Sequence, residues 1–367
     1  MAGWAIHRFK PSSIWVVTLL DPLRNLVWLS TRAYDKRFLY SLGDGKAHPD
    51  ELTTDEAKAF VKGAAEFGVD YFFVTGGGDP LIRRDMLDLA RYASEFSMAP
   101  YIRTDGWRID GSVASELASY GCKIIVTIAG LREVDEMLRG EGAYQRSIAA
   151  AKLCADHGML ASLSVVNTKH VVDQIRDLVS LAQELNSQGF SLASLIPQPI
   201  CVEEQRVRLL PLEPTPQEHE RELNEIYALS KEKGNDINIM AYDIFYNRIV
   251  SQNEPNTQLR SRCSLCHNLE SNEWLDVLDD GKAYGCSTLG LMFGDVRKDP
   301  IGQIMNRIRS SSIVRRIGDR RNLTGKCGIC EFNSICGGCR ARAYVYSRNM
   351  FGSDPSCPYA PSSALKF

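Results

Sequence analysis

The run Cys327-Gly-Ile-Cys330-Glu-Phe-Asn-Ser-Ile-Cys336-Gly-Gly-Cys339 decides how this 367-residue chain is interpreted. Thiols at such short spacing are typical of a metal site, and eight thiolates suffice for two four-ligand sites. The two glycines between Cys336 and Cys339 let the backbone turn, so we expect these neighbouring thiols to face different sites. Four further cysteines lie in the same C-terminal region: Cys263, Cys266, Cys286 and Cys357.

Three kinds of site compete for these eight cysteines. Structural zinc sites would use the same Cys-x-x-Cys pairs, and disulfides or idle buried thiols are a further option. A reducing cytosol keeps thiols free, which argues against disulfides. The Cys357-Pro step also recurs beside iron–sulfur ligands. We therefore predict iron–sulfur clusters. The other three cysteines, Cys122, Cys154 and Cys201, lie in apolar or helical contexts.

Outside this region, short β-rich runs alternate with amphipathic helical stretches from residue 14 to about residue 240. Such alternation predicts an α/β fold with a mainly parallel sheet, open or curled into a partial barrel, whose site lies at the C-terminal strand ends. The expected strands are 14–20, 70–74, 100–103, 123–128, 161–166 and 191–196. The expected helices are 55–67, 84–96, 111–119, 144–157, 172–186 and 217–233.

After about residue 253 this alternation disappears, and cysteines, glycines and arginines accumulate. We place a boundary near 245–258, which divides the chain into a barrel domain, 1–250, and an iron–sulfur domain, 251–367. The formal charge of −2 gives no reason to expect nucleic acid or membrane as a partner. The apolar run 14–20 is too short to span a bilayer and has no basic leader, so we expect a cytoplasmic protein.

The cysteine spacing resembles the SPASM domain, the C-terminal extension of many radical SAM enzymes that binds two auxiliary 4Fe–4S clusters. The run 327–343 is especially similar to members that act on haem precursors and ribosomal peptides. Earlier motifs extend the likeness over nearly the whole chain: Thr75-Gly-Gly-Gly-Asp-Pro-Leu81, Thr104-Asp-Gly106 and Arg139-Gly-Glu-Gly-Ala-Tyr144. The resemblance implies a partial (β/α)6 TIM-like barrel, a small Cys-rich domain after it, and two 4Fe–4S clusters on the eight cysteines.

The chain departs from the family where the first cluster would bind. The family carries Cys-x-x-x-Cys-x-x-Cys just after its first strand, and these three positions fall on Asp21, Asn25 and Trp28. No cysteine precedes Cys122. An asparagine is a poor iron ligand and an indole N–H can only donate. We expect the apolar residues 26–29 to fill the vacated volume. The resemblance therefore implies a chain that makes no 5′-deoxyadenosyl radical, with S-adenosylmethionine a doubtful cofactor.

Part of the family's pocket persists. Gly77, Gly78 and Asp79 occupy the Gly-Gly-Glu positions and can still hold a ligand amino group, although such a turn is also kept for backbone geometry alone. Arg340 and Arg342 follow the last cysteine of the run. They are placed to stabilise an anionic thiolate cluster or to meet carboxylates of a partner.

Three functions follow from these observations. The first is a degenerate radical SAM/SPASM protein that serves as an electron-transfer, scaffold or accessory subunit in cofactor (tetrapyrrole-like) or peptide maturation. It implies a protein partner, either a catalytic homologue or a redox partner. The alternative is a redox or transfer enzyme that uses the barrel mouth on a tetrapyrrole, a peptide or S-adenosylmethionine by other chemistry. The third is a zinc-stabilised binding module. Fold alone cannot choose among them.

Overall fold

The computed structural model describes residues 25–35, 38, 45–196, 207–234, 236–257 and 274–362. Its centre is a curved sheet with the strand order β10-β9-β8-β1-β2-β3-β4-β5-β6-β7. Strands β1 to β7 run parallel, β8 is parallel to β1, and β9 and β10 are antiparallel additions. The parallel strands are β1 (Asn25–Leu29), β2 (Tyr71–Thr75), β3 (Ala99–Thr104), β4 (Lys123–Ile128), β5 (Leu160–Val166), β6 (Gly189–Ala193), β7 (Asn238–Tyr242) and β8 (Trp274–Val277).

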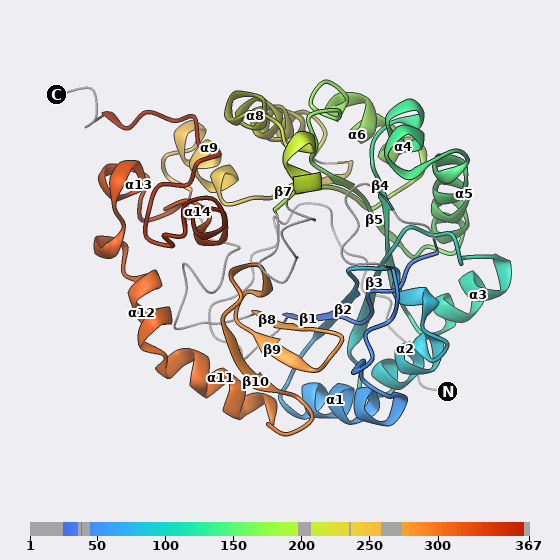
Figure 1. Ribbon diagram of the computed structural model, residues 1–367. Coiled ribbons are helices and arrows are strands. Elements are labelled where there is room, and N and C mark those ends of the chain that lie inside the picture. The colour runs from blue at the N-terminus through green and yellow to red at the C-terminus, as the bar shows by residue number, and fades with distance from the viewer. Residues whose placement is uncertain are drawn as a thin grey trace.

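Helices form a ring outside this sheet, as Figure 1 shows in a view along the barrel axis. Parallel strands need crossover connections, and a helix in each crossover covers the outer face of the sheet. The predicted fold class, an α/β partial barrel, is confirmed. The helices of the barrel are α1 (Thr54–Glu66), α2 (Met86–Glu95), α3 (Gly111–Ser119), α4 (Arg132–Arg139), α5 (Ala143–Asp156), α6 (Ile175–Glu184), α8 (Pro216–Glu232) and α9 (Phe245–Asn253).

The core lies between the sheet and its helices. Along β1, β2 and β3 the outward-facing residues are buried, and the alternate inward-facing residues keep partial exposure. Leu26 and Trp28 of β1 are fully buried beside Phe60 of α1 and Phe72 of β2. This period of two is what a strand with one packed face requires.

Helix ends match their sequence signals closely. Thr53 and Thr215 each form a capping box. The threonine side chain accepts a hydrogen bond from the backbone N–H three residues later, and the glutamate at that position accepts one from the backbone N–H of the threonine. As a result α1 and α8 begin within a residue of the predicted 55–67 and 217–233.

The first strand differs from the prediction. The expected strand 14–20 lies outside the described residues, and β1 is formed by Asn25–Leu29. Its apolar residues were expected to fill the vacated cluster pocket. Leu26 and Trp28 instead face the helices, because the alternation of a strand directs them away from the barrel interior. Strand β7 and helix α9, which lies within the expected boundary region 245–258, were also missed.

The C-terminal part returns to the same sheet before it forms its own helices. Strands β9 (Lys282–Tyr284) and β10 (Met292–Asp295) follow β8, and four helices then lead toward the C-terminus (Figure 1). The division into 1–250 and 251–367 stays a prediction. Among the described helices none is long and apolar enough to cross a membrane. The four helices are α11 (Ile301–Ser310), α12 (Ser312–Gly318), α13 (Gly325–Ile329) and α14 (Arg340–Ser347).

Candidate functional site

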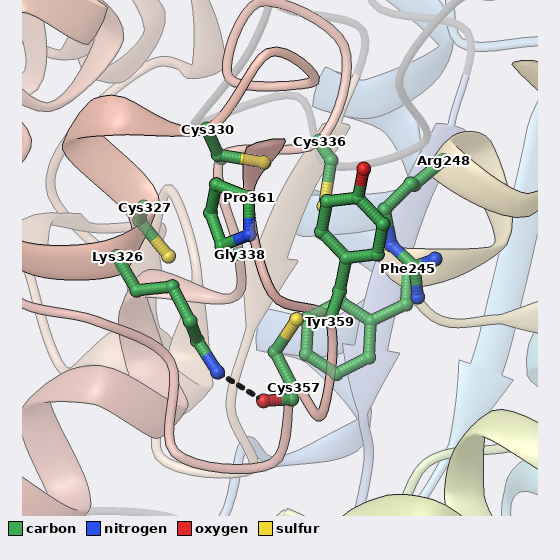
Figure 2. Close-up of a pocket in the computed structure, with 11 residues that line it drawn as sticks. Phe245, Arg248, Lys326, Cys327, Cys330, Cys336, Gly338, Cys357, Tyr359 and Pro361 are labelled. Atoms are coloured by element: carbon green, nitrogen blue, oxygen red, sulfur yellow. Dashed lines mark hydrogen bonds between the residues drawn. The ribbon is translucent and has the colours of Figure 1, made fainter. Parts of the chain in front are cut away.

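Four cysteines of the C-terminal part line one small, partly open cavity. They are Cys327, Cys330, Cys336 and Cys357. Figure 2 shows these side chains around a common space, with Phe245 and Arg248 of α9 on one side of it. Residues separated by up to 30 positions therefore meet at one place, as a four-ligand site requires.

Local backbone geometry selects which cysteines reach the cavity. Gly337 and Gly338 have φ of +62° and +71°, a left-handed conformation that favours glycine. A Cβ atom on Gly338 would lie 2.6 Å from Arg340 Nη2 and 3.1 Å from Cys327 Sγ. This turn leaves Cys336 on the cavity and carries Cys339 to the N-cap of α14, outside the lining.

Burial makes these thiols poor acids when they stand alone. It raises the pKa of Cys330, Cys336 and Cys357. A buried thiolate therefore needs a compensating positive charge, which a bound metal provides. Two hydrogen-bond donors face the sulfur of Cys327. Arg340 Nη2 lies 3.5 Å from Cys327 Sγ, and the backbone nitrogen of Asp354 lies 3.4 Å from it. Donors to a ligating sulfur stabilise its anionic form.

A zinc ion and an iron–sulfur cluster place different demands on the spacing of their ligands. Within the part of the chain that the structure describes, no three His, Cys, Asp or Glu side chains converge as closely as one metal ion requires. A zinc–sulfur bond is about 2.3 Å, so the four sulfurs of a zinc site crowd around one point. In a 4Fe–4S cluster the irons lie between the four cysteine sulfurs, so such a cluster needs a wider spacing of thiols than one zinc ion does.

The other predicted ligands form no complete set among the described residues. Cys286 is half-buried directly after β9, and Cys339 is half-buried at the start of α14. Cys263 and Cys266 lie outside the described residues, as does Cys201, so the second predicted cluster is not assembled here. Cys122 and Cys154 are buried in the barrel core, where burial raises the pKa of each thiol to about 12. They pack as small apolar side chains.

The glycine-rich loop at the barrel mouth is pressed against the segment that follows β1. The Gly78 N–H donates to Thr31 O at 3.1 Å, and the Asp79 N–H donates to Ala33 O at 2.8 Å. A Cβ atom on Gly78 would lie 1.8 Å from Ala33 O. Here Gly78 is required because another backbone takes the space of a side chain. Gly77 directly precedes these contacts and is partly exposed.

The Asp79 carboxylate is held by the protein itself. Its Oδ1 accepts from the Leu81 N–H at 2.9 Å, and its Oδ2 accepts from Thr104 Oγ1 at 2.6 Å and the Asp105 N–H at 2.9 Å. Burial and the neighbouring Asp79 raise the pKa of Asp105 to about 8. The predicted site residues Gly77, Gly78 and Asp79 thus belong to a loop that is held in place by hydrogen bonds within the protein. A ligand at this loop would have to compete with these bonds.

The three positions of the missing cluster carry no thiol. Asp21 lies outside the described residues. Asn25 begins β1 and Trp28 is fully buried in its outer face, 5.9 Å from the Phe60 ring centroid and 6.0 Å from that of Phe72. The residues present do not fit the cluster that the family binds at these positions.

Sequence analysis missed a buried polar network that joins the barrel to the Cys-rich part. Asp243 follows β7, accepts from Arg342 Nη1 at 2.5 Å, and lies 3.2 Å from His219 Nε2. Arg342 Nε also donates to Asp354 Oδ2 at 3.0 Å, and Asp354 Oδ2 accepts from the Cys339 N–H at 2.7 Å. The position of Arg342 after the cysteine run was the one signal available. Arg340 contacts a cysteine sulfur as predicted, and Arg342 meets carboxylates of its own chain.

Comparison with known proteins agrees with this geometry. Residues 37–182 match the radical SAM superfamily, a segment that starts after positions 21, 25 and 28. The chain is 27% identical to an AdoMet-dependent heme synthase from Methanosarcina barkeri, over 85% of this chain and 88% of the relative. It is 24% identical to a PqqA peptide cyclase from Bradyrhizobium diazoefficiens, over 85% of this chain and 79% of the relative.

Solved structures show the same fold. The structure of Streptococcus suis SuiB bound to its precursor peptide SuiA superposes with a TM-score of 0.71 at 16% identity, over 92% of this chain and 76% of that chain. The matched segment, the full-length relatives and the partial barrel point the same way. The predicted resemblance to radical SAM proteins is confirmed over residues 37–182, the segment that matches the radical SAM superfamily.

Proposed function

We propose that this chain is a cluster-carrying radical SAM protein that forms no 5′-deoxyadenosyl radical and assists a partner in cofactor or peptide maturation. The observation that carries the proposal is the contrast between the C-terminal cavity and the positions where the family binds its first cluster. Four cysteines surround one cavity in the C-terminal part, and an asparagine and a buried tryptophan stand where the family's first cluster would bind.

A 4Fe–4S cluster supplies one-electron transfer when it is bound. Cys327, Cys330, Cys336 and Cys357 would hold one such cluster, and Cys263, Cys266, Cys286 and Cys339 would hold the second. Arg340 directs a donor at Cys327, and Phe245, Tyr359 and Pro361 line the cavity and limit water. Buried surroundings and donors to sulfur are the protein's means of tuning a cluster potential.

The doubt about S-adenosylmethionine rests on positions 21, 25 and 28 alone. The first relative named above is called AdoMet-dependent, and the matched family is defined by this cofactor, so the comparisons themselves favour its binding. We propose that any S-adenosylmethionine bound here is not cleaved, because no thiolates are present to place an iron beside it.

Anaerobic purification followed by iron, sulfide and EPR analysis tests this proposal. We expect about eight irons per chain, as two 4Fe–4S clusters require, and no 5′-deoxyadenosine from S-adenosylmethionine under dithionite. Cys336→Ala should lose about four irons, whereas Cys154→Ala, a buried thiol in the barrel core, should lose none. Zinc in place of iron, a third cluster, or release of 5′-deoxyadenosine would contradict the proposal.

The accessory role needs a separate measurement. We expect the reduced protein to pass electrons to a catalytic radical SAM homologue, and stopped-flow spectroscopy would follow this transfer as bleaching of the donor's visible absorption. A Cys336→Ala variant should transfer fewer electrons per chain, with Cys154→Ala as its matched control. Complete inertness of the reduced wild-type chain toward such a homologue, together with a stable monomer that co-purifies with nothing, would count against the role.

A second candidate, an enzyme acting at the barrel mouth, is favoured by the Asp79–Asp105 pair. The raised pKa of Asp105 keeps it protonated near neutral pH, so that its carboxyl group could donate a proton at the barrel mouth. Turnover that follows a single ionisation near pH 8 and fails in Asp105→Asn would support this candidate over the first.

A further inference from the structure

The four-cysteine cavity, lined by Cys327, Cys330, Cys336 and Cys357, has a buried arginine in its wall. Arg248 lies on α9, a helix of the barrel part, and reaches the cavity beside Tyr359 (Figure 2). The Arg248 side chain is only 1% exposed. The barrel therefore supplies a positive charge to a site whose cysteines all lie in the C-terminal part.

A second cation of the lining, Lys326, is placed differently. Its ammonium group donates to the backbone carbonyl oxygen of Cys357 and is partly exposed (Figure 2). Water and dissolved ions screen an exposed charge more strongly than a buried one. Of these two cations, Arg248 therefore has the stronger influence on the charge inside the cavity.

The hydrogen bonds of Arg248 leave one of its N–H groups unused. Nη1 donates to Gln252 Oε1 at 2.7 Å, and Nη2 donates to the Glu220 carboxylate on α8. The Nε–H is buried and meets no acceptor within the described ranges of the chain. A buried donor without an acceptor costs folding free energy, and a sulfur atom bound in the cavity would supply that acceptor.

The ion pair of Arg248 with Glu220 is asymmetric in its burial. The Glu220 side chain is 24% exposed, so water screens the carboxylate more than it screens the guanidinium. The ring of Tyr359 covers the guanidinium, with its centroid 4.9 Å from the guanidinium carbon. The buried side of this pair, which lines the cavity, therefore keeps a net positive field.

This field reaches the thiols of the cavity. Burial raises the pKa of Cys336 and Cys357, and the charge of Arg248 opposes that rise at both thiols. A cation that favours thiolates also favours further negative charge placed among them.

Reduction of a 4Fe–4S cluster places such a charge. The cluster together with four thiolates is an anion, and its reduction adds one electron. A buried cation beside it stabilises the reduced state more than the oxidised state, because the reduced state is more negative. Net charge and hydrogen bonds to the sulfurs are among the properties that set the potential of a cluster.

We propose that Arg248 stabilises the reduced form of the cluster in the four-cysteine cavity and thereby raises its reduction potential. This inference rests on the cluster of the proposed function. The electron comes from a one-electron donor and leaves to the redox partner. No bond to Arg248 forms or breaks, and its guanidinium stays protonated in both states.

The alternative is a purely structural Arg248, whose bonds to Gln252 and Glu220 join α9 to α8. The two roles differ in what removal of the Glu220 charge does. Glu220→Gln takes away an opposing anion and keeps an acceptor for Arg248, so a tuning role predicts a higher reduction potential. A structural role predicts no change.

An EPR-monitored redox titration of the anaerobically purified full chain tests the proposal. The signal of this cluster is identified by its loss in Cys336→Ala. We expect Arg248→Met to make reduction roughly tenfold less favourable, as loss of a nearby unit charge implies, which lowers the midpoint potential by about 59 mV for one electron. Glu220→Gln should raise the potential. Arg248→Lys keeps the charge and should lie between wild type and Arg248→Met.

The matched control is Arg221→Met on α8, next to Glu220 in the chain. Its side chain is 60% exposed and pairs with Asp173 on the surface. Because water screens this pair, the variant should leave the midpoint potential unchanged.

An unchanged or higher potential in Arg248→Met at wild-type iron content would overturn this inference and leave the cluster proposal standing. A shift of the same sign in Arg248→Met and Glu220→Gln would overturn it as well. If Arg248→Met fails to fold or to retain iron, Glu220→Gln decides, and an unchanged or lower potential in that variant overturns the inference. A wild-type chain without iron would overturn the proposed function together with this inference.

Discussion

Arg342 and Asp243 join the two ends of the fold by a buried ion pair, with Arg342 Nη1 2.5 Å from Asp243 Oδ2. Asp243 follows the last parallel strand of the barrel, and Arg342 lies in α14, three residues after Cys339. Both side chains are less than 5% exposed. The Arg342 guanidinium also lies 4.4 Å from the ring centroid of Phe245, which lines the four-cysteine cavity. The cavity is therefore anchored to the barrel by charge as well as by packing.

Arg342→Met should be strongly destabilising. Burial opposes the charge of Asp243, but Arg342 and His219 hold the pKa of its carboxyl well below the usual range. Without Arg342, both Asp243 and Asp354 would be buried without their cation. Removing one partner of such a group costs about 3–5 kcal/mol. We expect a loss of that size in urea unfolding, whereas Arg348→Met at the exposed end of α14 should change stability by less than about 0.5 kcal/mol. Similar losses in the two variants would contradict the role of the ion pair.

Trp28→Cys restores the family's residue at the third position of the missing motif and should cost stability. The Trp28 ring is fully buried against Phe60 and Phe72, and the Arg83 guanidinium lies 5.1 Å from its centroid. Truncation of a buried tryptophan leaves a cavity and costs about 3–5 kcal/mol. Chemical unfolding followed by circular dichroism measures this loss. Met137→Ala on α4, at a 53% exposed side chain, is the surface control. An unchanged unfolding free energy in Trp28→Cys would show that position 28 is not part of the core.

The sequence predicted the fold better than it predicted the site, and particular residues explain why. Helices α1, α3 and α8 begin within one residue of the prediction, because Thr53, Asp110 and Thr215 cap their N-termini through local bonds. The candidate metal ligands were predicted from their spacing, which needs no tertiary information. In contrast, β1 was missed because strand pairing with β2 and β8 is non-local.

The Asp243–Arg342 pair could not have been predicted for the same reason. The two residues are separated by 99 positions in the chain, and no motif around Asp243 indicates that its carboxylate pairs with an arginine.

Two glycine-to-alanine substitutions should have opposite effects on the stability of the folded protein. Gly78→Ala would put a methyl group 1.8 Å from the Ala33 carbonyl oxygen, so the glycine-rich loop and the segment after β1 would have to separate. Forced overpacking of this kind costs about 1–3 kcal/mol. Gly63→Ala lies in α1, where a methyl group meets nothing within 4 Å, and it should stabilise the protein by about 0.5–1 kcal/mol. Urea midpoints compare the two directly, and a tolerated Gly78→Ala would mean that the loop is not clamped as described.

Glu222 should make stability fall as pH rises. Its side chain is fully buried in α8, and burial raises its pKa to about 8, although the Asn167 amide donates to Oε2 at 3.1 Å. The ordinary value is 4.5, so between about pH 4.5 and 8 the folded protein binds a proton that the unfolded chain releases. Stability from this group is complete below that window and is lost across it.

Glu222→Gln should therefore flatten the fall in unfolding free energy between pH 5 and 8, and should gain most stability at pH 8 relative to wild type. Part of the slope should remain, because Asp105 titrates in the same direction and range. The matched control is Glu225→Gln on the same helix, whose carboxylate pairs with the exposed Arg176 at 2.9 Å and should leave the slope unchanged. Urea unfolding at several pH values measures all three proteins. A slope as steep in Glu222→Gln as in wild type, or a wild-type stability that rises with pH across this window, would show that Glu222 is ionised in the folded protein.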